Sequence, residues 1–162
     1  MKDALNTALT YLSRRALTRF QLVQRLEKKG FNEEEIQECL TRLLEWGYLN
    51  DQEYARSYCL NKKTSYSKKR ISYELKVRGI DRSIIEEILA DSYPSEQEKE
   101  LCRKYAQGLW AEETRRWEKT DQKKKGKIPK EYYLKHKVGQ KLMQKGYPQE
   151  MIAQIVEELS NN

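Results

Sequence analysis

Lysine, arginine and tyrosine side chains gather in two stretches of this sequence, and they are the side chains whose types and spacing suggest chemistry. From Lys62 to Arg78, seven cations accompany one carboxylate, Glu74, and from Thr114 to Lys145 twelve cations accompany three. An aromatic ring between cations suits a phosphate backbone or an acidic protein groove. The whole chain of 162 residues has a net charge of +7, which also favours a polyanionic partner such as nucleic acid.

The residues that catalysis or metal binding would need are scarce. The single histidine, His136, has no serine, cysteine or second histidine near it in the sequence, and no Gly-rich phosphate loop is present. The three cysteines, at 39, 59 and 102, form no C-x-x-C pair, so neither a disulfide framework nor a zinc site is expected. We therefore predict no enzyme activity, no cofactor, no metal and three reduced cysteines in the core.

The first candidate contact surface lies on one predicted helix in the middle of the chain. At 100° per residue, Ile71 and Leu75 define its buried face. The opposite face carries an aromatic ring between two cations, which favours binding, although such lysines can also simply solvate an amphipathic helix. The predicted middle patch consists of Lys69, Arg70, Tyr73, Lys76 and Arg78.

Two further sets of cations extend this prediction. The C-terminal third contributes Lys130, Lys135, Lys137 and Lys141, and the N-terminal third contributes Arg14, Arg15 and Arg25. The run from Lys123 to Lys127 is typical of a mobile loop of like charges, and such a run can also become ordered on a polyanion.

The elements that must position these side chains are repeats. Residues 22–31, 71–80 and 138–147 all read apolar, three residues, leucine, two residues, a cation, glycine, apolar, so nine apolar and three glycine positions coincide. Apolar residues four apart lie on one helix face, and a glycine after a cation ends a helix in the left-handed conformation. Gly30, Gly79 and Gly146 are therefore predicted to be structural rather than phosphate-binding.

Each glycine is followed by the start of a second helix. Asn32 with Glu35 forms a capping-box pattern, Asp81 can cap the second copy, and Pro148 suits the first turn of the third. A further helix precedes each pair and spans Asp3 to Arg14 in the first copy. In the other copies this helix begins at Asn50 and at Pro94, and the last and longest runs through Leu101, Tyr105, Leu109 and Trp117.

The predicted fold is all-α, an elongated tandem array of three three-helix repeats at residues 1–50, 51–93 and 94–162. The third repeat has a longer first helix and the Lys-rich loop. The composition, 38% hydrophobic and 35% charged, fits units that each need only a narrow apolar seam. No apolar stretch is long enough to span a membrane, and the opening residues lack the apolar segment of a secretory signal, so we expect a soluble, cytoplasmic monomer.

The sequence resembles the RecX family, bacterial regulators of the recombinase RecA, over nearly its whole length. The resemblance is clearest in Leu49-Asn50-Asp51-Gln52-Glu53-Tyr54-Ala55 and in Lys68-Lys69-Arg70-Ile71-Ser72-Tyr73-Glu74-Leu75-Lys76-Val77-Arg78-Gly79-Ile80. It extends to Ala8-Leu9-Thr10-Tyr11-Leu12, Gly47-Tyr48-Leu49 and Gly146-Tyr147. The chain departs from the family at Ser67, where a glycine is expected, and in the lysine-rich stretch 119–130.

The resemblance implies a modulator, mainly an inhibitor, that lies in the groove of a RecA filament on single-stranded DNA. It would lower ATP hydrolysis and strand exchange, and so regulate homologous recombination, DNA repair and the SOS response. The implied partners are the RecA filament and single-stranded DNA, bound directly or through RecA, with weaker binding to duplex DNA and none to membranes.

Two other function classes remain open from the residues alone. One is an autonomous helical DNA-binding protein whose three-helix units act like helix-turn-helix modules, although no repeat displays a compact recognition set of Arg, Asn or Gln. The other is an adaptor that binds a protein without any nucleic acid.

Overall fold

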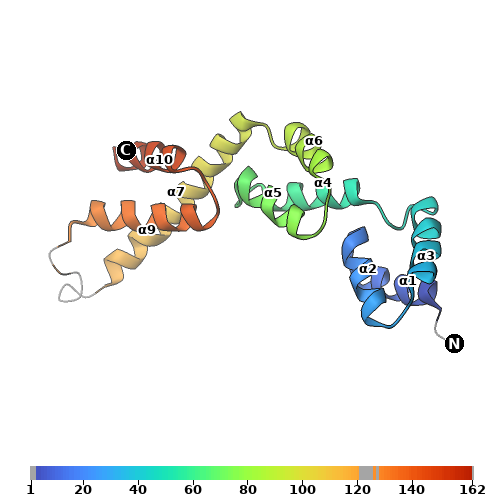
Figure 1. Ribbon diagram of the computed structural model, residues 1–162. Coiled ribbons are helices and arrows are strands. Elements are labelled where there is room, and N and C mark those ends of the chain that lie inside the picture. The colour runs from blue at the N-terminus through green and yellow to red at the C-terminus, as the bar shows by residue number, and fades with distance from the viewer. Residues whose placement is uncertain (1–2, 121–125, 127, 162) are drawn as a thin grey trace. The chain divides into compact units, whose positions relative to one another are not determined.

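The computed structural model describes residues 3–120, 126 and 128–161, and every regular element in these ranges is an α-helix (Figure 1). The helices are α1 (Ala4–Arg14), α2 (Arg19–Lys28), α3 (Glu33–Glu45), α4 (Asp51–Lys62), α5 (Lys68–Val77), α6 (Arg82–Ser92), α7 (Ser95–Lys119), α9 (Lys130–Gln144) and α10 (Gln149–Ser160). The predicted all-α repeat fold is confirmed. None of the described helices has the length and apolar run needed to cross a membrane.

The starts of α2, α3 and α4 have side-chain caps. Prolines precede α7, α9 and α10 without a side-chain cap, and Pro148, expected in the first turn of its helix, is the N-cap of α10. Thr18 and Gln21 form a reciprocal capping box at α2, and Asn32 and Glu35 form another at α3. The side chain of Asn50 accepts a hydrogen bond of 3.0 Å from the backbone N–H of Glu53 at the start of α4. Each cap satisfies N–H groups that have no partner within the first helical turn, so local sequence determines where these helices begin.

The chain forms two compact units. The first contains Met1–Cys59 with Ser72–Ser92, and the second contains Leu60–Ile71 with Tyr93–Asn162, so α4 and α5 contribute residues to both. In the first unit, α1, α2 and α3 bury a cluster that includes Ala8, Leu22, Leu26, Leu40 and Leu43. In the second, α7, α9 and α10 bury a cluster that includes Cys102, Ala106, Val138, Leu142 and Ile155.

The buried face of α7 includes small side chains. Leu109 is buried, Leu101 and Tyr105 are partly buried, and the positions beside them, Cys102 and Ala106, are fully enclosed. Small side chains allow helices to approach closely. They contribute little to the hydrophobic periodicity of a sequence, which large apolar residues dominate. The third cysteine of the chain thus lies at a helix-helix contact.

All three cysteines are free and buried, as predicted. Burial raises the pKa of Cys39, and burial raises the pKa of Cys102 to about 12. Since the thiolate is the reactive and metal-binding form, these two thiols are chemically quiet core residues.

The repeat glycines adopt the left-handed conformation, with φ of 89° at Gly30, 76° at Gly79 and 88° at Gly146, which confirms their structural role. At Gly79 a Cβ atom would collide with the side chain of Phe20, and at Gly146 it would lie 2.7 Å from the Oγ of Ser67. These two glycines therefore allow close packing as well as the turn itself.

In each unit a residue just before a helix donates a hydrogen bond to the carbonyl that precedes a repeat glycine, through a hydroxyl in one unit and a backbone N–H in the other. In the first, the Oγ1 of Thr18, the N-cap of α2, donates a hydrogen bond of 2.6 Å to the carbonyl of Arg78 in the α5–α6 turn. In the second, the N–H of Ser67, just before α5, donates one of 3.1 Å to the carbonyl of Lys145 in the α9–α10 turn. Ser67, which departs from the family glycine, is buried, and its Oγ accepts from the N–H of Arg70.

Candidate nucleic-acid and protein interface

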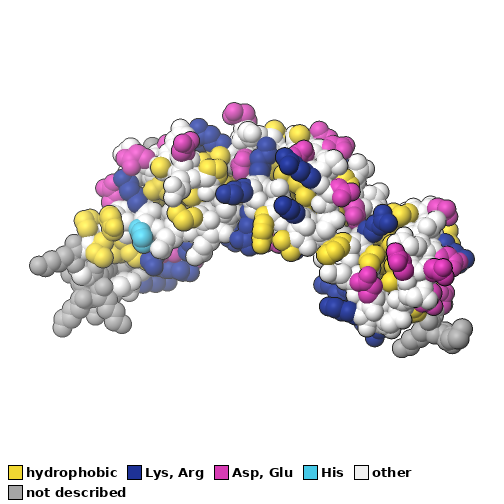
Figure 2. Space-filling view, in the orientation of Figure 1, with side chains coloured by type: hydrophobic (Ala, Val, Ile, Leu, Met, Phe, Trp, Pro, Cys, Tyr) yellow, Lys and Arg dark blue, Asp and Glu magenta, His cyan; other side chains and the backbone are white. Residues whose placement is uncertain are grey.

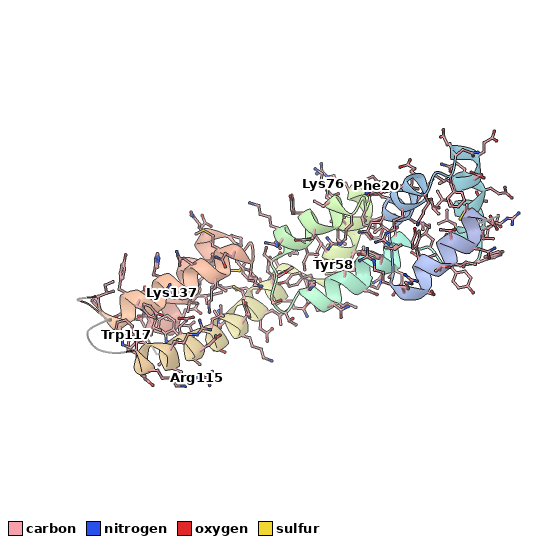
Figure 3. All side chains as sticks on the ribbon, turned by 90° about the horizontal axis from the view of Figure 1, so that it is seen from below. Phe20, Tyr58, Lys76, Arg115, Trp117 and Lys137 are labelled. Carbon is pink, nitrogen blue, oxygen red and sulfur yellow. The ribbon has the colours of Figure 1, made fainter. Side chains whose placement is uncertain are left out.

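Helix α5 presents the predicted face of cations and an aromatic ring. Ile71 and Leu75 are fully buried, whereas Lys69, Tyr73 and Lys76 are exposed, Tyr73 by 64%. Figure 3 shows Lys76 pointing away from the ribbon, and Figure 2 shows Lys and Arg side chains over α4 and α5. The helical period therefore predicted this face correctly, and its binding role stays a prediction.

Arg78 belongs to the predicted patch by sequence, but its guanidinium makes internal contacts. It lies 2.8 Å from the Oε2 of Glu74 and 4.7 Å from the centroid of the Tyr58 ring. Burial acts to lower the pKa of Arg78, but the hydrogen bond with Glu74 and the neighbouring Tyr58 raise that pKa overall. Arg78 thus ties α5 to α4 at the end of the helix.

Arg70 faces a different neighbourhood from Lys69 and Tyr73. Its Nη1 donates a hydrogen bond of 3.0 Å to the carbonyl of Gln144 at the end of α9, and its guanidinium lies 5.1 Å from the ring centroid of Tyr66. Lys62 and Lys145 also approach this ring. These two lysines and Tyr66 were not among the site residues predicted from the sequence, although Lys145 is the cation that precedes glycine in the third repeat segment.

Most of the four lysines predicted on α9 are paired with carboxylates. Lys141 contacts buried Glu113 at 2.7 Å, Lys130 contacts Glu118 at 3.3 Å, and Lys135 contacts two carboxylates on its own helix and on α10. Lys137 is exposed and lies 5.9 Å from the ring centroid of Tyr133. Among the described residues, Lys137 is the one lysine of these four that has no carboxylate partner.

Glu113 is a buried carboxylate in the middle of the second unit, with 2% of its side chain exposed. It accepts hydrogen bonds from the Nζ of Lys141 at 2.7 Å, from the hydroxyl of Tyr133 at 3.1 Å and from Arg116 at 3.3 Å. Burial acts to raise the pKa of Glu113, but these hydrogen bonds and the charges of Lys141 and Arg116 hold it below its ordinary value. Glu113 was not predicted from the sequence, because a glutamate within a helix gives no sign that it is buried.

The predicted arginines of the first unit separate into two places. Arg15 and Arg25 line one surface hollow with Gln21, Gln24 and Lys28, and Arg25 lies 5.3 Å from the ring centroid of Tyr11. Arg14 lines a neighbouring hollow that also contains acidic side chains. The structure therefore brings Arg15 and Arg25 together and leaves Arg14 in a more neutral environment.

Aromatic side chains lie near the start of α9. The ring of Trp117, which is labelled in Figure 3, has its centroid 4.8 Å from that of Tyr133. Exposed His136 stacks on exposed Tyr132 with a centroid distance of 6.2 Å. No group of His, Cys, Asp and Glu among the described residues could hold a metal ion. The lysines from Lys123 to Lys127 lie outside the described residues.

Comparisons with known proteins agree over most of the chain. The family model of the RecX first three-helix domain matches residues 4–43, and that of the second matches residues 50–89. A "Regulatory protein RecX" of Caldanaerobacter subterraneus is 45% identical over 103 residues, 63% of this chain and 52%, about half, of that relative. One from Clostridium perfringens strain SM101 is 30% identical, with 97% of this chain and 68% of the relative covered.

A solved structure agrees with these matches. The crystal structure of RecX from Lactobacillus salivarius superimposes with a TM-score of 0.71 at 26% identity, and the match covers 98% of this chain and 96% of that one. The likeness thus includes the third repeat, which neither family model matches.

Proposed function

The chain belongs to the RecX family, and from this premise we propose that it regulates the recombinase RecA by binding the RecA filament on single-stranded DNA. In this proposal the chain lies in the filament groove, lowers ATP hydrolysis and strand exchange, and so regulates homologous recombination, DNA repair and the SOS response. The observation that carries the proposal is the exposed face of Lys69, Tyr73 and Lys76 on α5.

The charge at the start of α5 supports a binding role. Its first turn contains Lys68, Lys69 and Arg70 and no acidic residue. A helix N-terminus already carries about half a positive elementary charge, so cations there act against helix stability. In the folded chain the buried carboxylate of Glu98 accepts a hydrogen bond of 2.8 Å from the N–H of Lys68, so one negative charge lies at this helix start. The three cations still outnumber it, which favours an anionic partner.

The internal contacts divide the predicted residues by role. We assign direct contact with the filament to Lys69, Tyr73 and Lys76, with Lys137 from α9. Arg78 is paired with half-buried Glu74, and Lys141 is paired with buried Glu113. Either cation would have to leave its carboxylate before it could contact the filament directly, and that separation costs free energy. We therefore assign these two residues a structural role, in which they stabilise the fold that presents the contact residues.

Reversal of charge on the α5 face tests the proposal. We expect Lys69→Glu with Lys76→Glu to raise the concentration needed to inhibit the single-stranded-DNA-dependent ATPase of RecA by about tenfold or more, because like charges would then face the filament. Both side chains are exposed, so circular dichroism should show unchanged helical content.

The matched control for this variant carries the same change of charge on another helix. Lys99→Glu with Lys104→Glu alters two cations of α7 and should inhibit RecA much as the parent chain does. If the α5 double variant inhibits RecA as well as this control does, the assignment of the α5 face is wrong.

Salt dependence separates this proposal from a protein adaptor. If phosphates and acidic side chains are the main contacts, the affinity for the filament should fall by about tenfold or more between about 50 and 200 mM salt. The measurement is the ATPase inhibition curve at each salt concentration, with RecA alone as the reference. Capture of RecA that is insensitive to both salt and nuclease would favour an adaptor that needs no nucleic acid.

A further inference from the structure

Two exposed aromatic rings lie parallel on α9 in the second unit. The rings of Tyr132 and His136 have an interplanar angle of 3° and a centroid distance of 6.2 Å. Tyr132 is 63% exposed, and His136 is exposed as well. Figure 2 shows the histidine, in cyan, at the surface with hydrophobic side chains beside it. We call Tyr132 and His136 the ring pair.

The ring pair lies on the side of α9 that faces away from the core. The buried residues of this helix are Leu134, Val138 and Leu142. Tyr132 and His136 are each two positions from Leu134, which places them about 160° from it around the helix axis. Among the described residues, neither the hydroxyl of Tyr132 nor the imidazole of His136 has a hydrogen-bond partner. The ring pair thus contributes little to the fold, and an external ligand would explain why rings occupy this face.

One flank of the ring pair carries an acidic side chain and the other a basic one. Glu131 and Lys137 lie on opposite flanks, because successive residues of a helix are about 100° apart. The carboxylate of Glu131 contacts Lys135, which also contacts Glu157, and it accepts a hydrogen bond from the hydroxyl of Ser160. Lys137 is exposed and has no carboxylate partner among the described residues. An anionic strand that crosses the rings would therefore place its charges on the Lys137 flank.

Accessible ring faces select a ligand that has flat faces of its own. Aromatic rings attract one another in stacked or edge-to-face arrangements, and an aliphatic side chain has no flat face for such an arrangement. Proteins that bind single-stranded nucleic acid stack its bases on aromatic side chains, with cations along the backbone. In a duplex the base faces are covered by the neighbouring base pairs. The ring pair with Lys137 on its flank therefore favours single-stranded DNA over duplex DNA and over an aliphatic protein surface.

We propose that bases of single-stranded DNA stack on the ring pair directly, without RecA, while a neighbouring phosphate contacts Lys137. The inference rests on the proposed function, because it names the part of α9 that would contact the DNA of the filament. It adds Tyr132 and His136 to the residues that bind, and it gives Lys137 a phosphate as its ligand.

The test is the binding of a fluorescently labelled oligo(dT) to the full chain without RecA, followed by anisotropy. Tyr132→Leu with His136→Leu removes the flat rings but keeps apolar side chains, and we expect it to bind about tenfold more weakly than the parent. Tyr132→Phe with His136→Phe is the matched control, because it keeps both rings and removes their polar groups, and it should bind within about twofold of the parent. All these changes are at exposed positions, so thermal melts should show both variants folded.

Salt dependence separates the stacked bases from the phosphate contact. The slope of log affinity against log salt reports how many phosphates the chain neutralises, so the variant with two leucines should keep a slope close to that of the parent. In Lys137→Gln the slope should become shallower by about 0.7, as expected for the loss of one phosphate contact. An unchanged slope in Lys137→Gln would contradict the phosphate contact of Lys137.

The outcomes separate this inference from the proposed function. If the parent does not bind oligo(dT), or if the variant with two leucines binds it as tightly as the one with two phenylalanines, the inference is overturned even where the parent inhibits RecA. If the variant with two leucines keeps its oligo(dT) affinity but no longer inhibits RecA, the ring pair contacts protein and the inference is again wrong. If the parent binds oligo(dT) through the ring pair without inhibiting RecA, the proposed function fails and the inference stands.

Discussion

Valine at position 79 is expected to destabilise the chain by about 3 kcal/mol or more and to lower its melting temperature by about 10 °C. Gly79 has a φ of 76°, a conformation that a β-branched residue adopts only with strain. In addition, its Cβ would collide with Phe20 at the start of α2. Thermal and urea unfolding followed by circular dichroism would measure both effects together.

Gly30 provides the matched control, because it occupies the same position in the first repeat segment. Its φ is 89°, but a Cβ there would meet no atom within 4 Å. Gly30→Val therefore carries the strain of the left-handed conformation without the collision, and it should destabilise the chain less than Gly79→Val. An unchanged melting temperature for Gly79→Val would contradict the account of the α5–α6 turn.

Methionine in place of Lys141 is expected to cost about 3 kcal/mol at neutral pH, because it leaves the Glu113 carboxylate buried without its nearest cation. The hydroxyl of Tyr133 and the guanidinium of Arg116 remain, and they keep the loss from being larger. Urea unfolding at neutral pH is the measurement. Lys137→Met, one helical turn earlier and exposed, is the control and should change stability by no more than about 0.5 kcal/mol.

The pH dependence of this loss has a definite sign. In the parent, the folded-state pKa of Glu113 is lowered, so its contribution is present above the unfolded-state pKa and is lost as pH falls through the folded-state pKa. Lys141→Met removes the hydrogen bond and the charge of Lys141 that lower this pKa, so the folded-state pKa of Glu113 is higher in the variant than in the parent. The stability difference between variant and parent should therefore shrink as pH falls below about 4.

A second substitution checks that the loss arises from the ion pair. Glu113→Gln combined with Lys141→Met removes both charges, so the double variant should be more stable than the sum of the two single losses implies. Equal stability of Lys141→Met and Lys137→Met at neutral pH would contradict the structural role of Lys141. If that role is correct, Lys141→Met should still inhibit RecA at temperatures where it remains folded.

Much of the fold followed from local sequence. The capping boxes at Thr18 and Asn32 and the left-handed glycines after the repeat cations were readable because each involves residues within one turn of a helix. The buried face of α7 was not readable in this way, since Cys102 and Ala106 are too small to mark a face by hydrophobicity. Their burial depends on how closely α9 and α10 approach α7, and that distance is not a local property.

The candidate site also has one part that local sequence predicts and another part that it does not. The sequence by itself determined that Lys69, Tyr73 and Lys76 share an exposed face, because 3.6 residues per turn relate positions on one helix whatever surrounds it. Only the tertiary structure decided that Lys141 pairs with Glu113 and that Lys145 joins Tyr66. These partners are far apart in the chain, and they meet only because separate helices pack in one particular arrangement.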